Sequence, residues 1–113
     1  MVIMIVDDNK AMRQAIRGVA AGVTDTVIEC ADGDEAVDSF NRYHPDWILM
    51  DIQMPKLDGI AAAKKILSFD STAKVVMVTE FDNESFRSAA KNAGVKAYVS
   101  KENLFELTDF IHH

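Results

Sequence analysis

The sequence has little cysteine, glycine or proline, and it contains no long run of apolar residues. A single cysteine among 113 residues, Cys30, excludes an internal disulfide and favours a reducing compartment. Five glycines and two prolines exclude a collagen-like or low-complexity chain. The longest apolar run, Met1 to Val6, is far shorter than the roughly 18 residues that a membrane span needs, and acidic residues follow it directly. We therefore expect a cytoplasmic protein with neither a membrane span nor a signal peptide.

Positive charge is also in deficit. The 12 lysines and arginines face 18 aspartates and glutamates, which gives a formal net charge of −6. Binding to nucleic acid or to an anionic membrane surface needs clustered lysine and arginine, so we expect neither as a direct partner of this chain. A chain of this length buries enough surface for one core. We assign residues 1–111 to a single domain and interpret His112 and His113 as the remnant of a purification tag.

Apolar runs and amphipathic stretches alternate along the chain. Runs rich in β-branched residues predict five strands, at residues 2–6, 26–30, 47–50, 75–79 and 95–99. The first, third and fourth are apolar almost throughout, which is typical of strands covered on both faces. The stretches that follow each strand predict helices near residues 12–21, 34–43, 58–67, 86–93 and 102–111. Asp58 is a residue type that begins helices, and Gly94 is one that ends them.

Five strand–helix units in one domain predict an α/β fold, namely a doubly wound, parallel, five-stranded sheet with helices on both faces. In such sheets ligands bind outside the carboxyl ends of the strands. Polar residues follow four of the predicted strands at this edge, and they are Asp7, Asp8, Asp51, Thr79, Ser100 and Lys101. We therefore expect these side chains to lie close together.

Three carboxylates at one edge of a sheet favour a site for a divalent cation. Like charges repel each other unless a cation lies between them, and hard oxygen ligands suit Mg²⁺ or Mn²⁺. Beside such a cation, Asp51 could accept a phosphoryl group and form an aspartyl phosphate. Lys101 would neutralise the phosphoryl oxygens, and Thr79 would donate a hydrogen bond to them. Taken singly, each of the three acids is more simply a solvated loop residue.

Four separated motifs carry a resemblance to a known family, in order along nearly the whole chain. They are Ile5-Val6-Asp7-Asp8-Asn9, Leu49-Met50-Asp51-Ile52-Gln53-Met54-Pro55-Lys56-Leu57-Asp58-Gly59, Val78-Thr79, and Ala97-Tyr98-Val99-Ser100-Lys101. With these motifs the sequence resembles the receiver domain of bacterial two-component response regulators. The resemblance implies a flavodoxin-like sheet with strand order 2-1-3-4-5. It also implies a phosphorylation-activated signalling switch rather than an enzyme.

The resemblance assigns roles to the polar residues at the carboxyl edge. Asp51 becomes the phosphoacceptor, and the donor becomes the phosphohistidine of a sensor histidine kinase. Asp7 and Asp8 become the acidic pair that positions Mg²⁺, with further ligands from Asp51 and from the backbone carbonyl of Gln53. Lys101 becomes the partner of the acceptor and then of its phosphoryl group.

Four more residues receive switch or loop-shaping roles from the resemblance. Thr79 is the switch hydroxyl, and Tyr98 is its aromatic partner, which turns inward when the hydroxyl moves toward the phosphoryl group. Pro55 and Gly59 shape the loop after the acceptor. In this family two further positions influence the lifetime of the phosphoryl group. In this sequence they are occupied by Gln53 and Phe81.

One position departs from the family pattern, because Glu102 follows Lys101 where many members have proline. Some members, notably regulators with a helix-turn-helix output, do without that proline. The run from Ser100 to Leu104 therefore favours an attached DNA-binding output domain, although a free-standing receiver stays open. Phe105 and Phe110 widen the apolar face of the last predicted helix. Together with the fourth helix and fifth strand, that helix is a candidate surface for a homodimer or an output partner.

Three other functions compete with this interpretation. An aspartyl-nucleophile phosphohydrolase needs a second acid two residues after the nucleophile, where this chain has Gln53. A flavin carrier on the same fold needs a hydroxyl-rich loop after the first strand, where Asp7 and Asp8 would repel the phosphate. A pseudo-receiver would bind a partner without phosphorylation, and the complete set of site residues argues against it.

Overall fold

The computed structural model describes residues 1–23, 26–80 and 83–111, so the tag remnant predicted at residues 112–113 lies outside the described residues. Strands and helices alternate in the predicted order along the described chain. The strands are β1 (Val2–Val6), β2 (Thr26–Cys30), β3 (Trp47–Met50), β4 (Val75–Thr79) and β5 (Ala97–Ser100). The helices are α1 (Lys10–Ala20), α2 (Gly33–Tyr43), α3 (Gly59–Phe69), α4 (Glu84–Ala93), the 3₁₀ helix η1 (Lys101–Leu107) and α5 (Thr108–Ile111).

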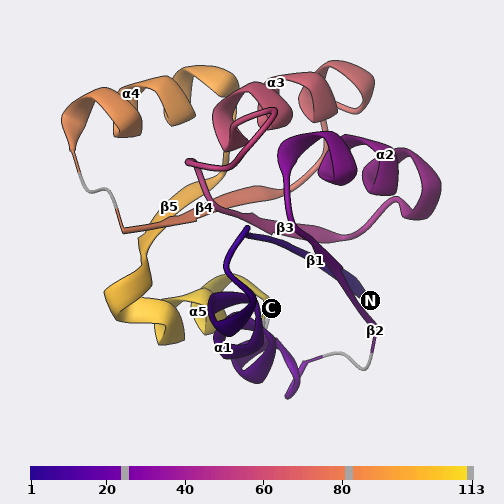
Figure 1. The fold of residues 1–113 in the computed structure, drawn as a ribbon, viewed down its shortest axis with the longest axis vertical. Helices are drawn as coiled ribbons and strands as arrows, with labels where there is room; N and C mark the ends of the chain where they lie inside the picture. The colour runs from indigo at the N-terminus through magenta and orange to yellow at the C-terminus, as the bar shows by residue number, and fades with distance from the viewer. Residues whose placement is uncertain (24–25, 81–82, 112–113) are drawn as a thin grey trace.

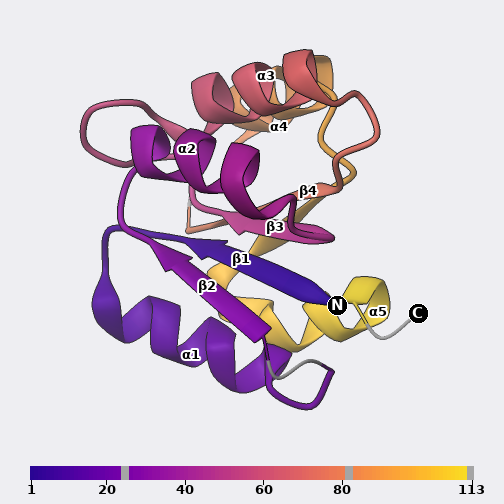
Figure 2. The same cartoon turned by 90° about the vertical axis from the view of Figure 1, so that its right-hand side faces the viewer.

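All five strands run parallel in one sheet, in the order β2-β1-β3-β4-β5. Helices α2, α3 and α4 cover one face, and α1 and α5 cover the other (Figures 1 and 2). The predicted fold class, strand order and two helical layers are therefore confirmed. Parallel pairing brings the carboxyl ends of all five strands to the same edge, opposite the N-terminus at the start of β1 (Figure 1).

The core lies in two layers, one on each face of the sheet. Alternate residues of β1, such as Met4 and Val6 against Ile3 and Ile5, belong to the two opposite layers. Every residue of β3 and β4 is buried, which explains why these strands are apolar without alternation. Cys30 is a buried strand thiol, and burial raises its pKa to about 11, so we expect it to stay protonated and unreactive.

Side-chain caps define where the helices begin. Asn9, Asp32, Asp58 and Asn83 each accept a hydrogen bond from the backbone amide three residues later, at the starts of α1, α2, α3 and α4. Gly94 ends α4 with a positive φ of 98°, a backbone conformation that suits glycine. The predicted helix boundaries at Asp58 and Gly94 are therefore confirmed.

The end of the chain differs from the prediction. Strand β5 covers residues 97–100 rather than 95–99, and the single helix predicted for residues 102–111 is a 3₁₀ helix followed by one turn of α-helix. Asn103 has non-helical dihedral angles (φ −126°, ψ 47°) and interrupts the segment. Lys101, the first residue of this segment, has its ammonium group held by two carboxylates at the sheet edge. Leu107 and Ile111 are still buried, as their spacing of four predicts.

Candidate functional site

Four strands place polar side chains together at the carboxyl edge of the sheet. Asp7 directly follows β1, Asp51 directly follows β3, Thr79 is the last residue of β4, and Lys101 directly follows β5. Asp7 and Thr79 are fully buried, and Asp51 is 5% exposed. Burial of two carboxylates costs free energy unless charged or hydrogen-bonding partners compensate for it.

Lys101 is the cation that joins the buried acids. Its Nζ lies 2.8 Å from Oδ2 of Asp7 and 3.2 Å from Oδ2 of Asp51. The second oxygen of Asp51 accepts a hydrogen bond from the amide of Ile52 at 2.8 Å. The second oxygen of Asp7 accepts one from the amide of Asn9 at 2.8 Å. One ammonium group therefore contacts two carboxylates whose other oxygens are fixed by the backbone.

The pKa values of the pair reflect this environment. Burial raises the pKa of Asp51, and the neighbouring Asp7 raises it further, which together outweigh the lowering by Lys101. Burial lowers the pKa of Lys101, but hydrogen bonding and attraction to Asp7 and Asp51 outweigh burial and raise it overall. Lys101 is consequently charged at neutral pH, and it remains beside a carboxylate that is harder to ionise than usual.

The three acids fit a hard divalent cation. Carboxylate oxygens of Asp7, Asp8 and Asp51 lie within 4.8 Å of one another, and Asp8 faces solvent. Oδ2 of Asp7 is buried and accepts no hydrogen bond of ordinary geometry from the described residues, since its contact with Lys101 is an ion pair. This buried oxygen and the carboxylates of Asp8 and Asp51 together form the kind of oxygen ligand set that Mg²⁺ or Mn²⁺ prefers. The backbone carbonyl of Gln53 stays a predicted ligand.

A hollow of about 280 Å³ opens over the acceptor. The residues that line it are Asp8, Asn9, Met12, Asp51, Gln53, Glu80 and Lys101. Glu80 is the member that sequence reasoning missed, because one exposed acid after a strand carries no signal by itself. It adds a third carboxylate to the lining, beside Asp8 and Asp51.

The loop from Asp51 to Gly59 is tightly fitted against the start of α3. A Cβ atom on Gly59 would lie 1.8 Å from the backbone oxygen of Asp51, so only glycine fits there. The amide of Gly59 donates to the oxygen of Ile52 at 2.7 Å, which closes the loop. Pro55 lies exposed in the same loop, and Lys56 has a positive φ of 66°.

Gly33, at the start of α2, is a second close approach that sequence reasoning missed. A Cβ atom on Gly33 would lie 2.1 Å from the backbone oxygen of Leu57. An ion pair of 3.7 Å between Lys56 and Asp32 joins the same two segments. The start of α2 therefore supports the loop that follows the acceptor.

The predicted switch pair lies on neighbouring strands. Thr79 pairs with Ser100 in the β4–β5 register, which places Tyr98 two residues back along β5. Tyr98 is partly buried, and the guanidinium of Arg87 lies 4.6 Å from the centre of its ring. The structure thus places both members of the pair near the acceptor edge. Phe81, predicted to influence the phosphoryl lifetime, lies outside the described residues.

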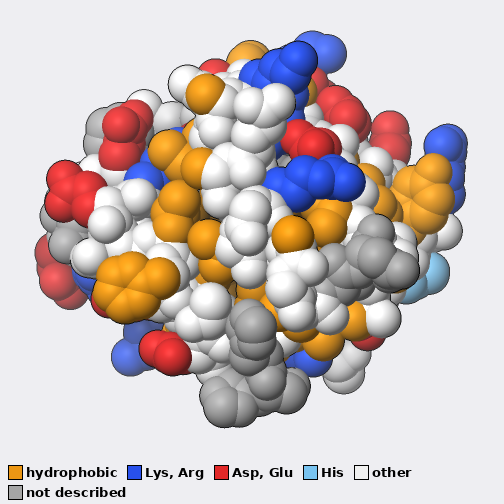
Figure 3. Space-filling view, turned by 90° about the horizontal axis from the view of Figure 1, so that it is seen from below, with side chains coloured by type: hydrophobic (Ala, Val, Ile, Leu, Met, Phe, Trp, Pro, Cys, Tyr) orange, Lys and Arg blue, Asp and Glu red, His pale blue; other side chains and the backbone are white. Residues whose placement is uncertain are grey.

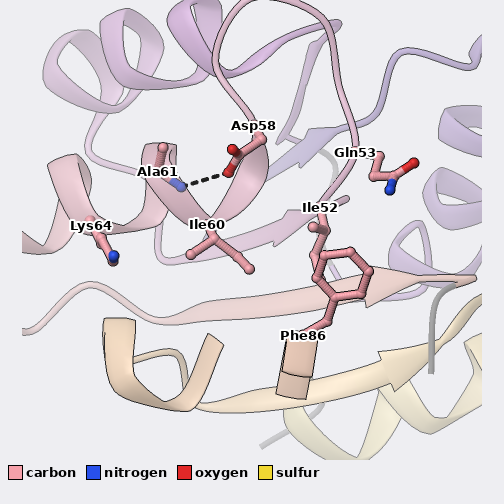
Figure 4. A pocket seen from close by; sticks show the side chains of 7 residues that line it. All are labelled: Ile52, Gln53, Asp58, Ile60, Ala61, Lys64 and Phe86. Atoms are coloured by element: carbon pink, nitrogen blue, oxygen red, sulfur yellow. Dashed lines mark hydrogen bonds between the residues drawn. The ribbon is translucent and has the colours of Figure 1, made fainter. Parts of the chain in front are cut away.

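A second hollow, of about 370 Å³, lies between α3 and α4 (Figure 4). The ring of Phe86 from α4 stands beside Ile52, while Ile60, Ala61 and Lys64 come from α3 (Figure 4). Gln53 lines this hollow as well as the one over Asp51, so it borders both.

The two phenylalanines of the last segment have different surroundings. Phe105 is 71% exposed, whereas Phe110 packs near Trp47, with ring centres 6.5 Å apart. Phe110 therefore belongs to the margin of the core, and the apolar surface is narrower than predicted. On the face formed by α1 and α5, hydrophobic side chains are interspersed with polar and charged ones (Figure 3). In the described part of the chain, no helix combines the length and the apolar character of a membrane span.

Comparison with known proteins gives one consistent family. The family model described as "Response regulator receiver domain" matches residues 3–112. A chemotaxis protein CheY of Halobacterium salinarum is 35% identical over 99 residues, which cover 88% of this chain and 82% of that protein. The transcriptional regulatory protein YxjL of Bacillus subtilis is 36% identical over 92% of this chain, which spans 49% of that longer protein. The crystal structure of a LuxR-family response regulator from Aurantimonas has a TM-score of 0.89 and 30% identity, covering 98% of this chain and 81% of that one.

Proposed function

This chain belongs to the response regulator receiver domain family, and from this premise we propose that it is the phosphorylation switch of a two-component system. In this proposal Asp51 accepts a phosphoryl group from the phosphohistidine of a sensor histidine kinase in the cytoplasm. The observation that carries the proposal is the cluster at the carboxyl edge, where Asp51 lies 3.2 Å from Lys101 and its carboxylate belongs to the group formed with Asp7 and Asp8.

The chemistry is a displacement at phosphorus. A carboxylate oxygen of Asp51 forms a P–O bond while the P–N bond of the phosphohistidine breaks. The electron pair of the P–N bond stays on the ring nitrogen, and the imidazole, protonated at its other nitrogen, leaves as neutral histidine. The ammonium of Lys101, already beside Asp51, then faces the new phosphoryl oxygens, and the hydroxyl of Thr79 donates to one of them.

A divalent cation completes the proposed site. Asp8, Asp51 and the backbone carbonyl of Gln53 would hold Mg²⁺, with the buried Asp7 in the same cluster, and the ion would neutralise charge that develops on the phosphoryl oxygens. The raised pKa of Asp51 disfavours its ionised form, which is the form that attacks phosphorus. A bound cation would offset this by stabilising the negative carboxylate.

The proposed output is a change at the surface of α4, β5 and the segment after it. Movement of Thr79 toward the phosphoryl group would let Tyr98 turn inward and shift the population of this surface. A groove of about 350 Å³ lies there, lined by Arg87, Lys91 and Lys96 around an apolar floor. These three cations favour an acidic partner segment. An attached helix-turn-helix domain is a second proposed partner, because the relatives include a longer transcriptional regulatory protein. A second copy of this chain is the third.

The experiment that tests the proposal is intact-mass spectrometry after incubation with acetyl phosphate and Mg²⁺. Wild-type protein should gain one phosphoryl group, and omission of Mg²⁺ should prevent the gain. The Asp51→Asn variant should gain none, whereas Asp38→Asn, at an exposed acid of α2, should behave as wild type. Phosphorylation of Asp51→Asn at the wild-type level would refute the assignment of the acceptor.

The hydrolase alternative makes a different prediction. Gln53 lines the hollow over Asp51 with an amide, which cannot supply the proton that a phosphohydrolase gives to its leaving group. We expect one phosphoryl group per chain and no sustained release of product from a generic phosphate ester. Continuous turnover of such an ester would favour the hydrolase instead.

A further inference from the structure

Arg13, in the first turns of α1, reaches back to the loop that carries the acidic pair. Its Nη1 donates to the backbone oxygen of Asp7 at 2.7 Å, and its Nε donates to Oε1 of Glu29 at 3.1 Å. The Arg13 side chain is 17% exposed, so both contacts are largely shielded from water. No role in the proposed phosphoryl transfer uses this arginine.

The carbonyl that Arg13 holds belongs to the peptide group between Asp7 and Asp8. Asp7 still follows the ladder of the sheet, since its amide donates to the oxygen of Cys30 at 3.0 Å. Because a peptide group is planar, a fixed carbonyl oxygen fixes the orientation of the whole group. It thereby fixes the position of the Asp8 Cα atom, from which the exposed side chain leaves the backbone.

Glu29, on β2, holds the guanidinium in place from the other side. Its Oε1 accepts from Arg13, and its Oε2 accepts from Nη1 of Arg17 at 2.9 Å. The two arginines lie four residues apart and so occupy the same face of α1. Arg13 donates to the acidic loop as well as to Glu29, whereas Arg17 lies one helical turn further from that loop, which makes Arg17 a natural control.

We propose that Arg13 is a positioning residue for the metal site, which holds the Asp7–Asp8 peptide group so that Asp8 faces the cation, and that Glu29 orients Arg13 for this task. This inference rests on the proposed function, because it assumes a divalent cation at the acidic cluster. Arg13 itself would not be a metal ligand. Residues that hydrogen-bond to a metal-binding loop without binding the metal orient its ligands, and their loss typically weakens metal binding by about 10- to 100-fold.

The test is the dissociation constant of Mg²⁺ itself, measured by isothermal titration calorimetry. Arg13→Met should raise it by about 10-fold or more, whereas Arg17→Met should change it by less than about 2-fold. Both substitutions remove one ion pair to Glu29, so the lost carbonyl contact is what separates them. Equal constants in the two variants would overturn the inference.

A measurement without metal checks the structural step. In metal-free protein, the amide nitrogen resonance of Asp8 should shift in Arg13→Met and stay in place in Arg17→Met, because a hydrogen bond to a carbonyl polarises the attached amide. An Asp8 resonance that is unchanged in Arg13→Met would overturn the inference on its own. If Arg13 only stabilised the fold, both variants would melt at a lower temperature. The two variants would then differ neither in the dissociation constant of Mg²⁺ nor in the Asp8 resonance.

Two further comparisons keep the outcome clear. Arg13→Lys retains the charge but has one ammonium for two acceptors, so it should fold and still bind Mg²⁺ more weakly than wild type. Should Arg13→Met fail to fold, a wild-type constant in Arg13→Lys would overturn the inference. If wild-type protein binds no Mg²⁺, the proposed function fails. If wild type and Arg13→Met bind Mg²⁺ equally, the proposed function stands and the positioning role is wrong.

Discussion

Substitution of Gly59 by alanine probes the fit between the acceptor loop and α3 most sharply. The added Cβ would lie 1.8 Å from the backbone oxygen of Asp51 and 2.8 Å from its carbonyl carbon. Real Cβ atoms essentially never approach another heavy atom within 3.0 Å, so one of the two segments has to move by at least 1.2 Å. The atoms nearest to the added Cβ are all backbone, which leaves no flexible side chain to absorb the movement.

The expected cost follows from the size of this clash. Overpacking in a well-packed region costs about 1–3 kcal/mol, and a clash with backbone places Gly59→Ala near about 3 kcal/mol. With an unfolding entropy of about 2.1 cal/mol/K per residue, a chain of 113 residues should then melt about 12 °C lower. Because the moved atom belongs to Asp51, phosphorylation should also slow by about 100-fold.

Gly18 supplies the matched control for thermal unfolding followed by circular dichroism. It lies within α1, and a Cβ there meets nothing within 4 Å. Gly18→Ala should therefore gain about 1 kcal/mol from helix propensity and melt about 4 °C higher. Each kcal/mol of stability shifts the melting temperature of this chain by roughly 4 °C. A melting temperature of Gly59→Ala within about 2 °C of wild type would therefore refute the close approach.

Three further outcomes follow from the charges at the site. Because burial and Asp7 raise the pKa of Asp51 above the value of 3.8 for a free side chain, its ionisation should reduce stability as the pH rises above 3.8. Asp51→Asn should remove this loss of stability and melt higher than wild type at neutral pH without metal. A pH profile of the melting temperature that is the same in Asp51→Asn and wild type would contradict the raised pKa of Asp51. For the same reason protons compete with Mg²⁺, so calorimetry should show weaker Mg²⁺ binding by wild type as the pH falls from neutral, and a constant affinity would contradict the raised pKa. Glu80→Gln removes one negative charge from the hollow over Asp51 and should speed phosphorylation by acetyl phosphate, an anion, by about 2- to 5-fold at low salt. That gain should disappear near 1 M salt, where the screening length is about 3 Å, and a salt-independent gain would point to a steric cause.

The strands and the gathering of polar residues at one edge were predictable from sequence for one physical reason. Buried parallel strands are apolar throughout, so runs such as Trp47–Met50 identify themselves, and the polar residue that follows each run lies at a common edge. The strand pattern alone therefore brings Asp7, Asp51 and Lys101 together. Their distances and the raised pKa of Asp51 depend on burial, which sequence does not give.

Other features depend on contacts between distant segments, and sequence reasoning did not reach them. Helical spacing predicted the buried side chains Leu107 and Ile111, but it missed the interruption at Asn103. The partnership of Arg13 with Glu29 requires the position of α1 over β2, and the need for Gly33 requires the path of a loop more than twenty residues away. Neither carries a local signal in the chain.

The central claim is that Asp51 is the residue that receives the phosphoryl group, and chemical mapping tests it most directly. Borohydride reduces an acyl phosphate to an alcohol, which converts a phosphorylated aspartate into homoserine that peptide mass spectrometry can locate. After treatment with acetyl phosphate and Mg²⁺, homoserine should appear at position 51 alone, and it should be absent when either reagent is omitted. Homoserine at Asp7 or Asp8, or a stable phosphate on Thr79 or Ser100, would contradict the account.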